Sequence, residues 1–240
     1  FIFSIQYRRL LRPPILRLPQ HGCINLHFGL LPRYGGCYPI AWAILNGESQ
    51  AGATLHYMSE KFDEGDVIAQ GAVPIHPDTT ARNLFDALSD RAADLFAQTY
   101  AALSRQSVET RAQDLREQLY YTKDSIDFAK DQWIDWHEAG IAVQRRICAF
   151  TFEPFQLPST GIHLPSGGDI TATVARTRLY SSQDQMAAGK PGHVAEVTDN
   201  GSVVVGTGNG EWIEIGQLNG QPARDFIESL GVHPQEVVLI

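Results

Sequence analysis

CINLHFGLLPRY, residues 23–34, places an asparagine and a histidine two positions apart at the end of an apolar run. In a β-strand, residues i and i+2 project from the same face, so Asn25 and His27 are expected to present an amide and an imidazole side by side. The Leu-Leu-Pro sequence that follows then leads into an aromatic turn. Such a pair is either catalytic or a buried pair whose polar groups satisfy one another.

The first hundred residues alternate between short apolar runs and segments with helical periodicity. The runs predict strands at residues 1–7, 22–28, 52–58 and 66–75, and the periodic segments predict helices at residues 11–18, 39–47 and 79–103. In the longest of these helices, Leu84, Leu88 and Leu95 fall at helical spacing. The alternation of strands and helices is typical of an α/β sheet.

The sequence changes character after residue 105. A polar stretch leads to a helix predicted at residues 136–150, and short strands with Gly, Pro and Asn turns follow. The sequence GTGNG at residues 206–210 lacks the lysine and the helix of a phosphate-binding loop, so we expect a hairpin turn there. Three regions are therefore predicted: residues 1–105, a connecting segment with a helix at 106–150, and a β-rich unit at 151–240.

Composition excludes several classes of protein. The chain has 240 residues, 43% of them hydrophobic, and no apolar stretch reaches the roughly 20 residues of a membrane span, so no membrane partner is expected. Four arginines interrupt the first 20 residues, which argues against a signal peptide. Cys23, Cys37 and Cys148 are odd in number and without CxxC spacing, which predicts free thiols, no metal site and a cytoplasmic protein.

Three motifs in order along the chain carry a resemblance to a known family. Asn25-x-His27 is followed by Leu-Leu-Pro-x-Tyr and then by Asp63-x-Gly65. With these motifs, the N-terminal half resembles the folate-dependent formyltransferases, most closely those that act on nucleotide sugars. The segments that resemble the family's C-terminal unit and the join to it are residues 134–156 and 190–223.

The resemblance implies an α/β fold in which a partial Rossmann-like formyltransferase domain, with a mixed sheet flanked by helices, precedes a small β-rich C-terminal subdomain. The family opens with further strand-helix repeats, so the catalytic domain in residues 1–105 is expected to be N-terminally incomplete, by about two repeats of roughly thirty residues each. A non-catalytic remnant or binding subunit is therefore an alternative to an active enzyme.

The resemblance also implies roles for the motif residues. Asn25 would hold the oxyanion of the tetrahedral intermediate through its amide N–H. His27 would take the proton of the attacking amine or help to bind the oxyanion, and Asp63 would orient His27 or relay a proton. Which of these two carries the proton is left open. Glu64 and Asp66 compete with Asp63 for its role, and the position before x-Gly favours Asp63.

His56, on another predicted strand, has two possible interpretations. His56 could touch the substrate, or it could have a structural role. Trp42 and Ile44, on the helix after the turn, are expected in the core.

The formyl donor implied by the resemblance is 10-formyltetrahydrofolate, with no metal. In the family, two backbone segments clasp the pterin. Here they correspond to Tyr7, Arg8, Arg9, Leu10 and Leu11, and to Ser59, Glu60, Lys61 and Phe62. Where many relatives read Tyr-Arg-Gly after Leu-Pro, this chain has Tyr34-Gly35-Gly36, so an arginine that could hold the acceptor is absent.

The acceptor of the formyl group is predicted from the charge of the C-terminal unit and from the family resemblance. Residues 151–240 carry four Lys or Arg against ten Asp or Glu, a net charge of −6, whereas binding to tRNA depends on neutralising phosphates. We therefore expect no nucleic acid as partner. The segments GCYPIAWAI (residues 36–44) and TLHYM (residues 54–58) resemble the branch of the family that acts on nucleotide-linked amino sugars, which implies a small nucleotide-linked amino sugar, in the 4-amino-4,6-dideoxy class, as partner. A methionyl-tRNA formyltransferase is the alternative, and the small C-terminal unit suggests a homodimer.

Overall fold

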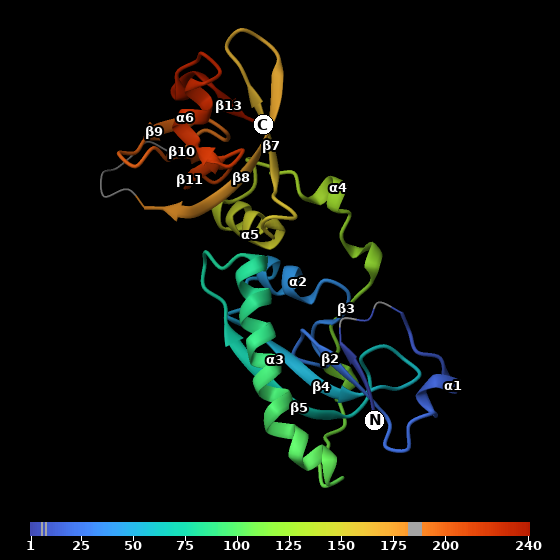
Figure 1. Cartoon of the computed structure of the whole chain (residues 1–240). Coiled ribbons are helices and arrows are strands. Elements are labelled where there is room, and N and C mark those ends of the chain that lie inside the picture. Colours follow the sequence, from blue (N-terminus) through green and yellow to red (C-terminus); the bar gives the residue numbers. More distant parts are fainter. Residues whose placement is uncertain (6, 8, 182–188) are drawn as a thin grey trace. The chain divides into compact units, whose positions relative to one another are not determined.

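The computed structural model describes residues 1–5, 7, 9–181 and 189–240. Its contacts divide the chain into two units, one of Phe1–Ile75 with Asn83–Ile126 and one of His76–Arg82 with Asp127–Ile240. Each unit has its own sheet and its own hydrophobic core (Figure 1).

The first unit is built on a four-stranded mixed sheet in the order β1-β2-β4-β5. Strand β1 runs parallel to β2, whereas β4 runs antiparallel to both β2 and β5, which confirms the predicted mixed α/β sheet. The elements of this unit are β1 (Ile2–Ile5), α1 (Pro13–Leu16), β2 (Cys23–His27), β3 (Gly35–Gly36), α2 (Pro39–Leu45), β4 (Gln50–Tyr57), β5 (Val67–Pro74), most of α3 (Ala81–Ser104), β6 (Tyr120–Tyr121) and the 3₁₀ turns Leu115–Glu117 and Lys123–Ser125.

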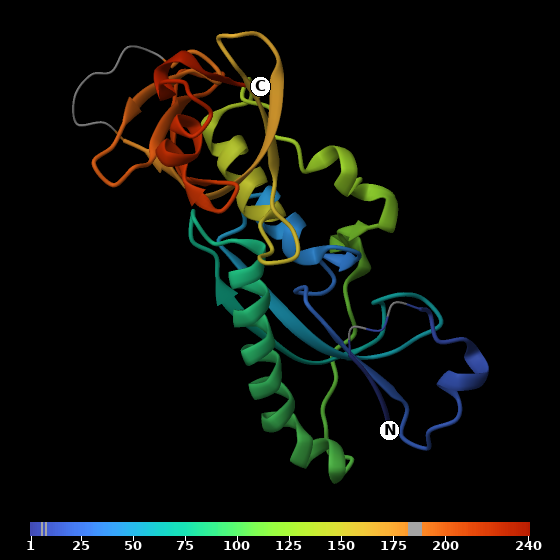
Figure 2. The same ribbon diagram turned by 45° about the horizontal axis from the view of Figure 1, so that its top comes forward.

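Helix α3 lies along the sheet of this unit in both ribbon views (Figures 1 and 2). Its Leu95 and Leu103 pack with Ile24 of β2 and Leu55 of β4, all four being buried. These contacts explain the apolar periodicity of the helix, because one stripe must face the sheet. Among the described residues, no helix is long and apolar enough to cross a membrane.

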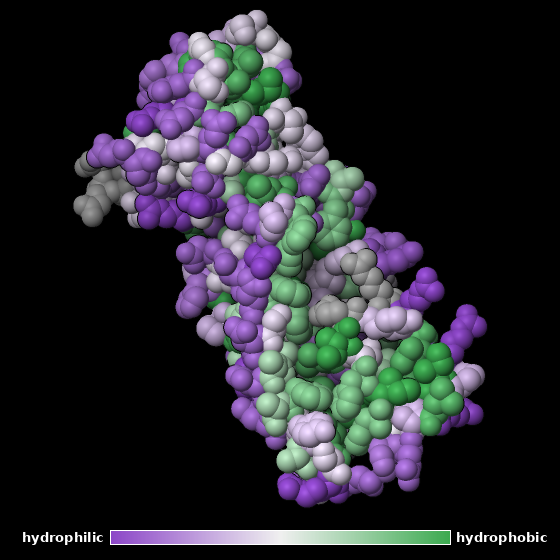
Figure 3. All heavy atoms as spheres, in the orientation of Figure 1, coloured by the Kyte–Doolittle hydropathy of each residue, from purple (hydrophilic) through white to green (hydrophobic). Residues whose placement is uncertain are grey.

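Strand β1 is an edge of the described sheet and carries apolar side chains that water can reach. Phe3 and Ile5 are 39% and 61% exposed. An apolar groove of about 340 Å³ lies between these residues, Leu26 of β2 and Phe96 of α3. Apolar residues also gather on the visible face of this unit (Figure 3). An exposed apolar edge of this kind offers unpaired backbone groups to a further strand.

The second unit is a curled antiparallel sheet in the order β13-β7-β8-β11-β10-β9, with β12 beside β11. Residues 206–210 connect the antiparallel strands β10 and β11, as predicted for a hairpin turn. The elements are α4 (Phe128–Asp131), α5 (Gly140–Phe150), β7 (Ser159–His163), β8 (Asp169–Tyr180), β9 (Val194–Val197), β10 (Val203–Gly206), β11 (Trp212–Leu218), β12 (Gln221–Pro222), α6 (Ala223–Glu228), the 3₁₀ turn Pro234–Glu236 and β13 (Val238–Leu239).

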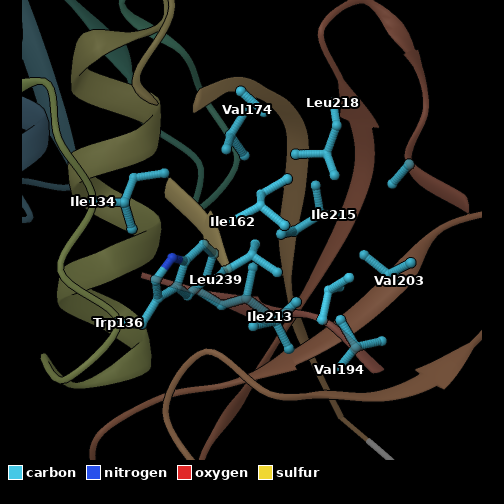
Figure 4. Close-up of a cluster of buried hydrophobic side chains, with 14 of the residues drawn as sticks. Ile134, Trp136, Ile162, Val174, Val194, Val203, Ile213, Ile215, Leu218 and Leu239 are labelled. Carbon is cyan, nitrogen blue, oxygen red and sulfur yellow. The ribbon is translucent and has the colours of Figure 1, made fainter. Parts of the chain in front are cut away.

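The core of the second unit is a cluster of buried side chains from this sheet, α5 and α6 (Figure 4). Trp136 is 1% exposed, and its indole Nε1–H donates to Thr160 Oγ1 at 2.9 Å. Ile213 and Ile215 of β11 meet Ile147 of α5 in the same cluster. The interior of this unit is therefore well packed, and residues 134–147 contribute to it together with the β-rich stretch after residue 151.

Two isoleucines on α5 test this packing. Ile147 is 2% exposed and Ile141 is 37% exposed. We expect Ile147→Ala to lower the free energy of unfolding by about 2–5 kcal/mol, because it leaves a cavity in the core. Ile141→Ala, the same substitution on the same helix, should cost less than about 1 kcal/mol. Urea titrations measure both, and equal losses would contradict this assignment of the buried face.

Candidate functional site

The pairing of β2 with β4 brings the predicted motif residues together. In this antiparallel register Asn25 lies opposite His56. The loop of residues 58–66 follows β4, and its two ends are joined by the hydrogen bond from Tyr57 N–H to the carbonyl of Asp66 at 2.9 Å. This loop brings Asp63 next to His27 and His56. Two motifs separated by more than thirty residues therefore form one polar cluster.

The Asp63 carboxylate is held by backbone from other segments. Asp63 itself adopts a left-handed conformation with φ of 56°, which few non-glycine residues adopt. The N–H of Gly36 donates to Asp63 Oδ2 at 2.8 Å. Gln113 secures the loop from outside, donating from Nε2 to the carbonyls of Asp63 and Gly65 at 2.8 and 2.7 Å. Gln113 belongs to the segment after α3, and nothing in the sequence motif points to it.

His27 faces Asp63 with one ring nitrogen and the backbone with the other. Its Nε2 lies 2.6 Å from the carbonyl oxygen of Tyr34, and its Nδ1 lies 3.7 Å from Asp63 Oδ2. A carbonyl oxygen can only accept, so Nε2 carries the hydrogen in the neutral ring. The lone pair of His27 is therefore on Nδ1, which faces the carboxylate.

His56 is part of the same cluster, which the motif did not predict. It is 2% exposed, and its Nε2 lies 3.1 Å from Asn25 Nδ2 and 3.5 Å from Asp63 Oδ1. Its Nδ1 lies 2.8 Å from the carbonyl oxygen of Tyr57. The signal that could have found it is the strand pairing, because His56 stands directly across from Asn25.

Burial controls the charges of the cluster. Burial lowers the pKa of the His27 imidazole below its ordinary 6.5, although the charge of Asp63 and the Tyr34 carbonyl act in the opposite direction. Burial acts to raise the pKa of the Asp63 carboxyl, but contact with His56, the positive charge that His27 carries when it is protonated, and the Gly36 N–H hold this pKa below its ordinary 3.8. At neutral pH the cluster therefore contains a neutral His27 and an ionised Asp63.

The structure of the loop distinguishes Asp63 from Glu64 and Asp66, the three candidates for the carboxylate beside His27. Asp63 faces the two histidines, with its side chain 10% exposed. Glu64 instead forms an ion pair with Lys61 at 3.1 Å. Asp66 is exposed, and its carbonyl closes the loop. Asp63 is accordingly the carboxylate that the fold places beside His27.

The two segments expected to contact the donor lie at the surface. Tyr7 and Leu10 are 57% and 40% exposed, and Phe62 is 46% exposed. Ser59 is tied to Lys61 within its turn by two hydrogen bonds. The remaining members are Arg9, Leu11 and Glu60, of which Arg9 and Glu60 are exposed, while Arg8 lies outside the described residues.

The turn after Leu-Leu-Pro requires a glycine at residue 36, next to Gly35, which stands where many relatives have an arginine. Gly36 has φ of 84°, and a Cβ at this position would collide with the carbonyl oxygen of Tyr121. Trp42 was expected in the core, but it is only half-buried and stacks on the Tyr121 ring, with 4.2 Å between ring centroids. Ile44, on the same helix, is 3% exposed and does belong to the core.

The three cysteines are free, with Cys23 and Cys148 buried. Burial raises the pKa of the Cys148 thiol to about 12, which makes it a poor nucleophile. In the described part of the chain, no group of three or more His, Cys, Asp or Glu side chains is placed to hold a metal ion.

The lowered pKa of Asp63 has a consequence for stability. A carboxyl whose pKa is lower in the folded chain stabilises the fold above its unfolded pKa, and this stabilisation is lost as pH falls through the folded pKa. At pH 7 we expect the free energy of unfolding of the wild type to be larger than that of Asp63→Asn. This difference should shrink below pH 3.8, the ordinary pKa of an aspartate. Urea titrations across pH measure it. Asp90→Asn, an exposed aspartate on α3, is the matched control, and a constant difference would contradict the charge assignment.

Comparison with known proteins identifies both parts of the chain. Residues 1–100 match the formyl transferase family, and residues 128–230 match the formyl transferase C-terminal domain. A methionyl-tRNA formyltransferase of Geobacter metallireducens is 31% identical over 97% of this chain and 71% of its own length.

Solved structures show the same fold. An N-formyltransferase from Helicobacter canadensis, solved with folinic acid and dTDP-3-aminofucose, has a TM-score of 0.68 at 21% identity, over 89% of this chain and 72% of that one. A sugar 3N-formyl transferase, solved with dTDP and 5-N-formyl-THF, has a TM-score of 0.67 at 23% identity, over 89% and 70%. The resemblance in the sequence motifs is thus confirmed, and the chain belongs to the formyltransferase family of enzymes.

Proposed function

We propose that this formyltransferase transfers the formyl group of 10-formyltetrahydrofolate to the amine of a nucleotide-linked amino sugar of the 4-amino-4,6-dideoxy class. The observation that supports formyl transfer is the cluster of Asn25, His27 and Asp63, in which a neutral amide, bonded to His56, lies in one group with a buried, ionised carboxylate and a neutral imidazole. The acidic C-terminal unit supports the choice of acceptor.

Asn25 provides the donor for the oxyanion. The amine nitrogen attacks the formyl carbon, and the carbonyl oxygen becomes an oxyanion as the tetrahedral intermediate forms. Asn25 is half-buried, whereas His27 and His56 are buried, so of the neutral members of the cluster Asn25 is the one most open to a bound carbonyl. A prepositioned N–H aimed at the developing charge stabilises the transition state.

His27 and Asp63 together accept the proton. The lone pair of His27 Nδ1 faces Asp63 Oδ2 at 3.7 Å without a hydrogen between them. A proton taken from the attacking amine is stabilised there by the carboxylate. When the bond between the formyl carbon and the folate nitrogen breaks, that nitrogen takes a proton, and tetrahydrofolate leaves.

The donor binds along the two exposed backbone segments. Tyr7, Leu10 and Phe62 offer apolar surface for a pterin ring, and the backbone of residues 59–62 runs directly into Asp63. This connection would let the loop that binds the donor also position the carboxylate. The three unpaired cysteines fit the cytoplasm, where folate cofactors and reduced thiols occur together.

A methionyl-tRNA acceptor is the second candidate. It is favoured by the relative from Geobacter metallireducens at 31% identity. Against it stands the net charge of −6 over residues 151–240, since a tRNA-binding surface needs basic side chains to neutralise phosphates. We therefore rank the amino sugar first.

Acceptor assays decide between the two candidates. The chain is incubated with 10-formyltetrahydrofolate and, in parallel, a panel of nucleotide-linked amino sugars and methionyl-tRNA. We expect N-formylated sugar nucleotide, detected by mass spectrometry. Formylated methionyl-tRNA with salt-sensitive tRNA binding would support the second candidate. A chain that formylates neither would support the non-catalytic alternative.

Substitution of the cluster tests the assigned roles. Asn25→Ala should lower kcat by about 10²–10³-fold, because an oxyanion donor is lost. His27→Ala and Asp63→Ala should lower kcat by at least about 10²-fold, because proton transfer is lost. Asn200→Ala, which removes an asparagine from a turn of the second unit, is the matched control and should keep kcat within about two-fold. Near-normal turnover of His27→Ala would overturn the assignment.

A further inference from the structure

His56 occupies a position that gives it control over the Asn25 side chain. The two residues are directly opposed in the β2-β4 register, so the backbone fixes their separation. His56 Nε2 lies 3.1 Å from Asn25 Nδ2. His56 is 2% exposed, which leaves its ring little freedom to turn away.

The hydrogen bonds of His56 determine which tautomer it adopts. Its Nδ1 lies 2.8 Å from the carbonyl oxygen of Tyr57, and a carbonyl oxygen can only accept, so Nδ1 carries the hydrogen. In the neutral ring, Nε2 is then an acceptor. The amide nitrogen of Asn25 can only donate, so the bond runs from Asn25 Nδ2–H to His56 Nε2.

This bond removes one of two possible orientations of the Asn25 amide. A flipped amide would place Asn25 Oδ1 against the lone pair of His56 Nε2, where two acceptors would repel. In the observed orientation Nδ2 has two hydrogens, of which His56 takes one. The second hydrogen of Asn25 remains for a ligand oxygen.

We propose that His56 is a positioning residue, which holds the Asn25 amide with one N–H free for the oxyanion. The inference rests on the oxyanion role given to Asn25 in the proposed function. Its physical basis is preorganisation: a donor fixed before the reaction needs no reorientation as charge develops, and small misplacements of such groups are costly to turnover.

Three variants separate positioning from packing. His56→Leu fills a similar volume without an acceptor, whereas His56→Gln can place an amide oxygen where Nε2 lies. Leu55→Val, at a buried neighbour on the other face of β4, is the control for destabilisation alone. All three are compared in kcat, in KM for 10-formyltetrahydrofolate and in thermal stability.

We expect His56→Leu to lower kcat by about 10–100-fold with KM for the donor within about three-fold of wild type. His56→Gln should recover most of the lost kcat, and Leu55→Val should keep it. If His56→Leu retains kcat within about two-fold, or if His56→Gln is as impaired as His56→Leu while folded, the positioning role is wrong.

A spectroscopic measurement tests the tautomer without any acceptor. In ¹⁵N-histidine-labelled protein, the ring signal that disappears in His56→Gln belongs to His56. We expect this signal to report a hydrogen on Nδ1 and a bare Nε2, and a hydrogen on Nε2 would overturn the inference. If wild type formylates none of the acceptors, the proposed function fails, and the tautomer alone decides whether His56 can orient Asn25.

Discussion

The buried carboxylate of Asp63 is the group on which the arrangement of the site depends. An ionised carboxylate is costly to remove from water unless hydrogen-bond donors surround it. Here the N–H of Gly36 supplies one donor, at 2.8 Å. Two histidine ring nitrogens also face the carboxylate, His27 Nδ1 at 3.7 Å and His56 Nε2 at 3.5 Å, and each can donate to it only when its ring is protonated. Because these groups come from separate segments, the loop, the turn and the strand pair are held in one arrangement.

The tautomers of the two histidines leave no hydrogen between either ring and the Asp63 carboxylate. The carbonyls of Tyr34 and Tyr57 each occupy the hydrogen-bearing nitrogen of one histidine. The other ring nitrogens, His27 Nδ1 and His56 Nε2, carry lone pairs in the neutral rings, and both face the negative charge of Asp63. One added proton would turn a repulsive contact into a charge-assisted hydrogen bond. The geometry therefore favours proton uptake, while burial keeps the imidazole of His27 neutral beforehand.

The part of this site that depends on the local side-chain periodicity of a strand could be predicted from the sequence, and the part that depends on long-range contacts could not. Asn25 and His27 share a face because the side-chain period of a strand is two. His56 joins them through the register of β4 against β2, which no local spacing specifies. Gln113 reaches the Asp63 loop from a segment beyond a 24-residue helix. The strands of the sheet and α3 were predictable for the first reason, since strand and helix periods are local, whereas the mixed strand directions were implied only by the family resemblance.

The exposure of the cluster decides what a substrate meets first. His27 and His56 are 8% and 2% exposed, and the Asp63 side chain is 10% exposed, so the ionisable groups lie beneath the surface. Asn25, which is half-buried, is uncharged and cannot titrate. A formyl carbonyl that reaches the site therefore meets a neutral donor whose orientation is already fixed. The charge that develops there is separated from bulk water by the same packing that keeps the imidazole of His27 neutral and free to accept a proton.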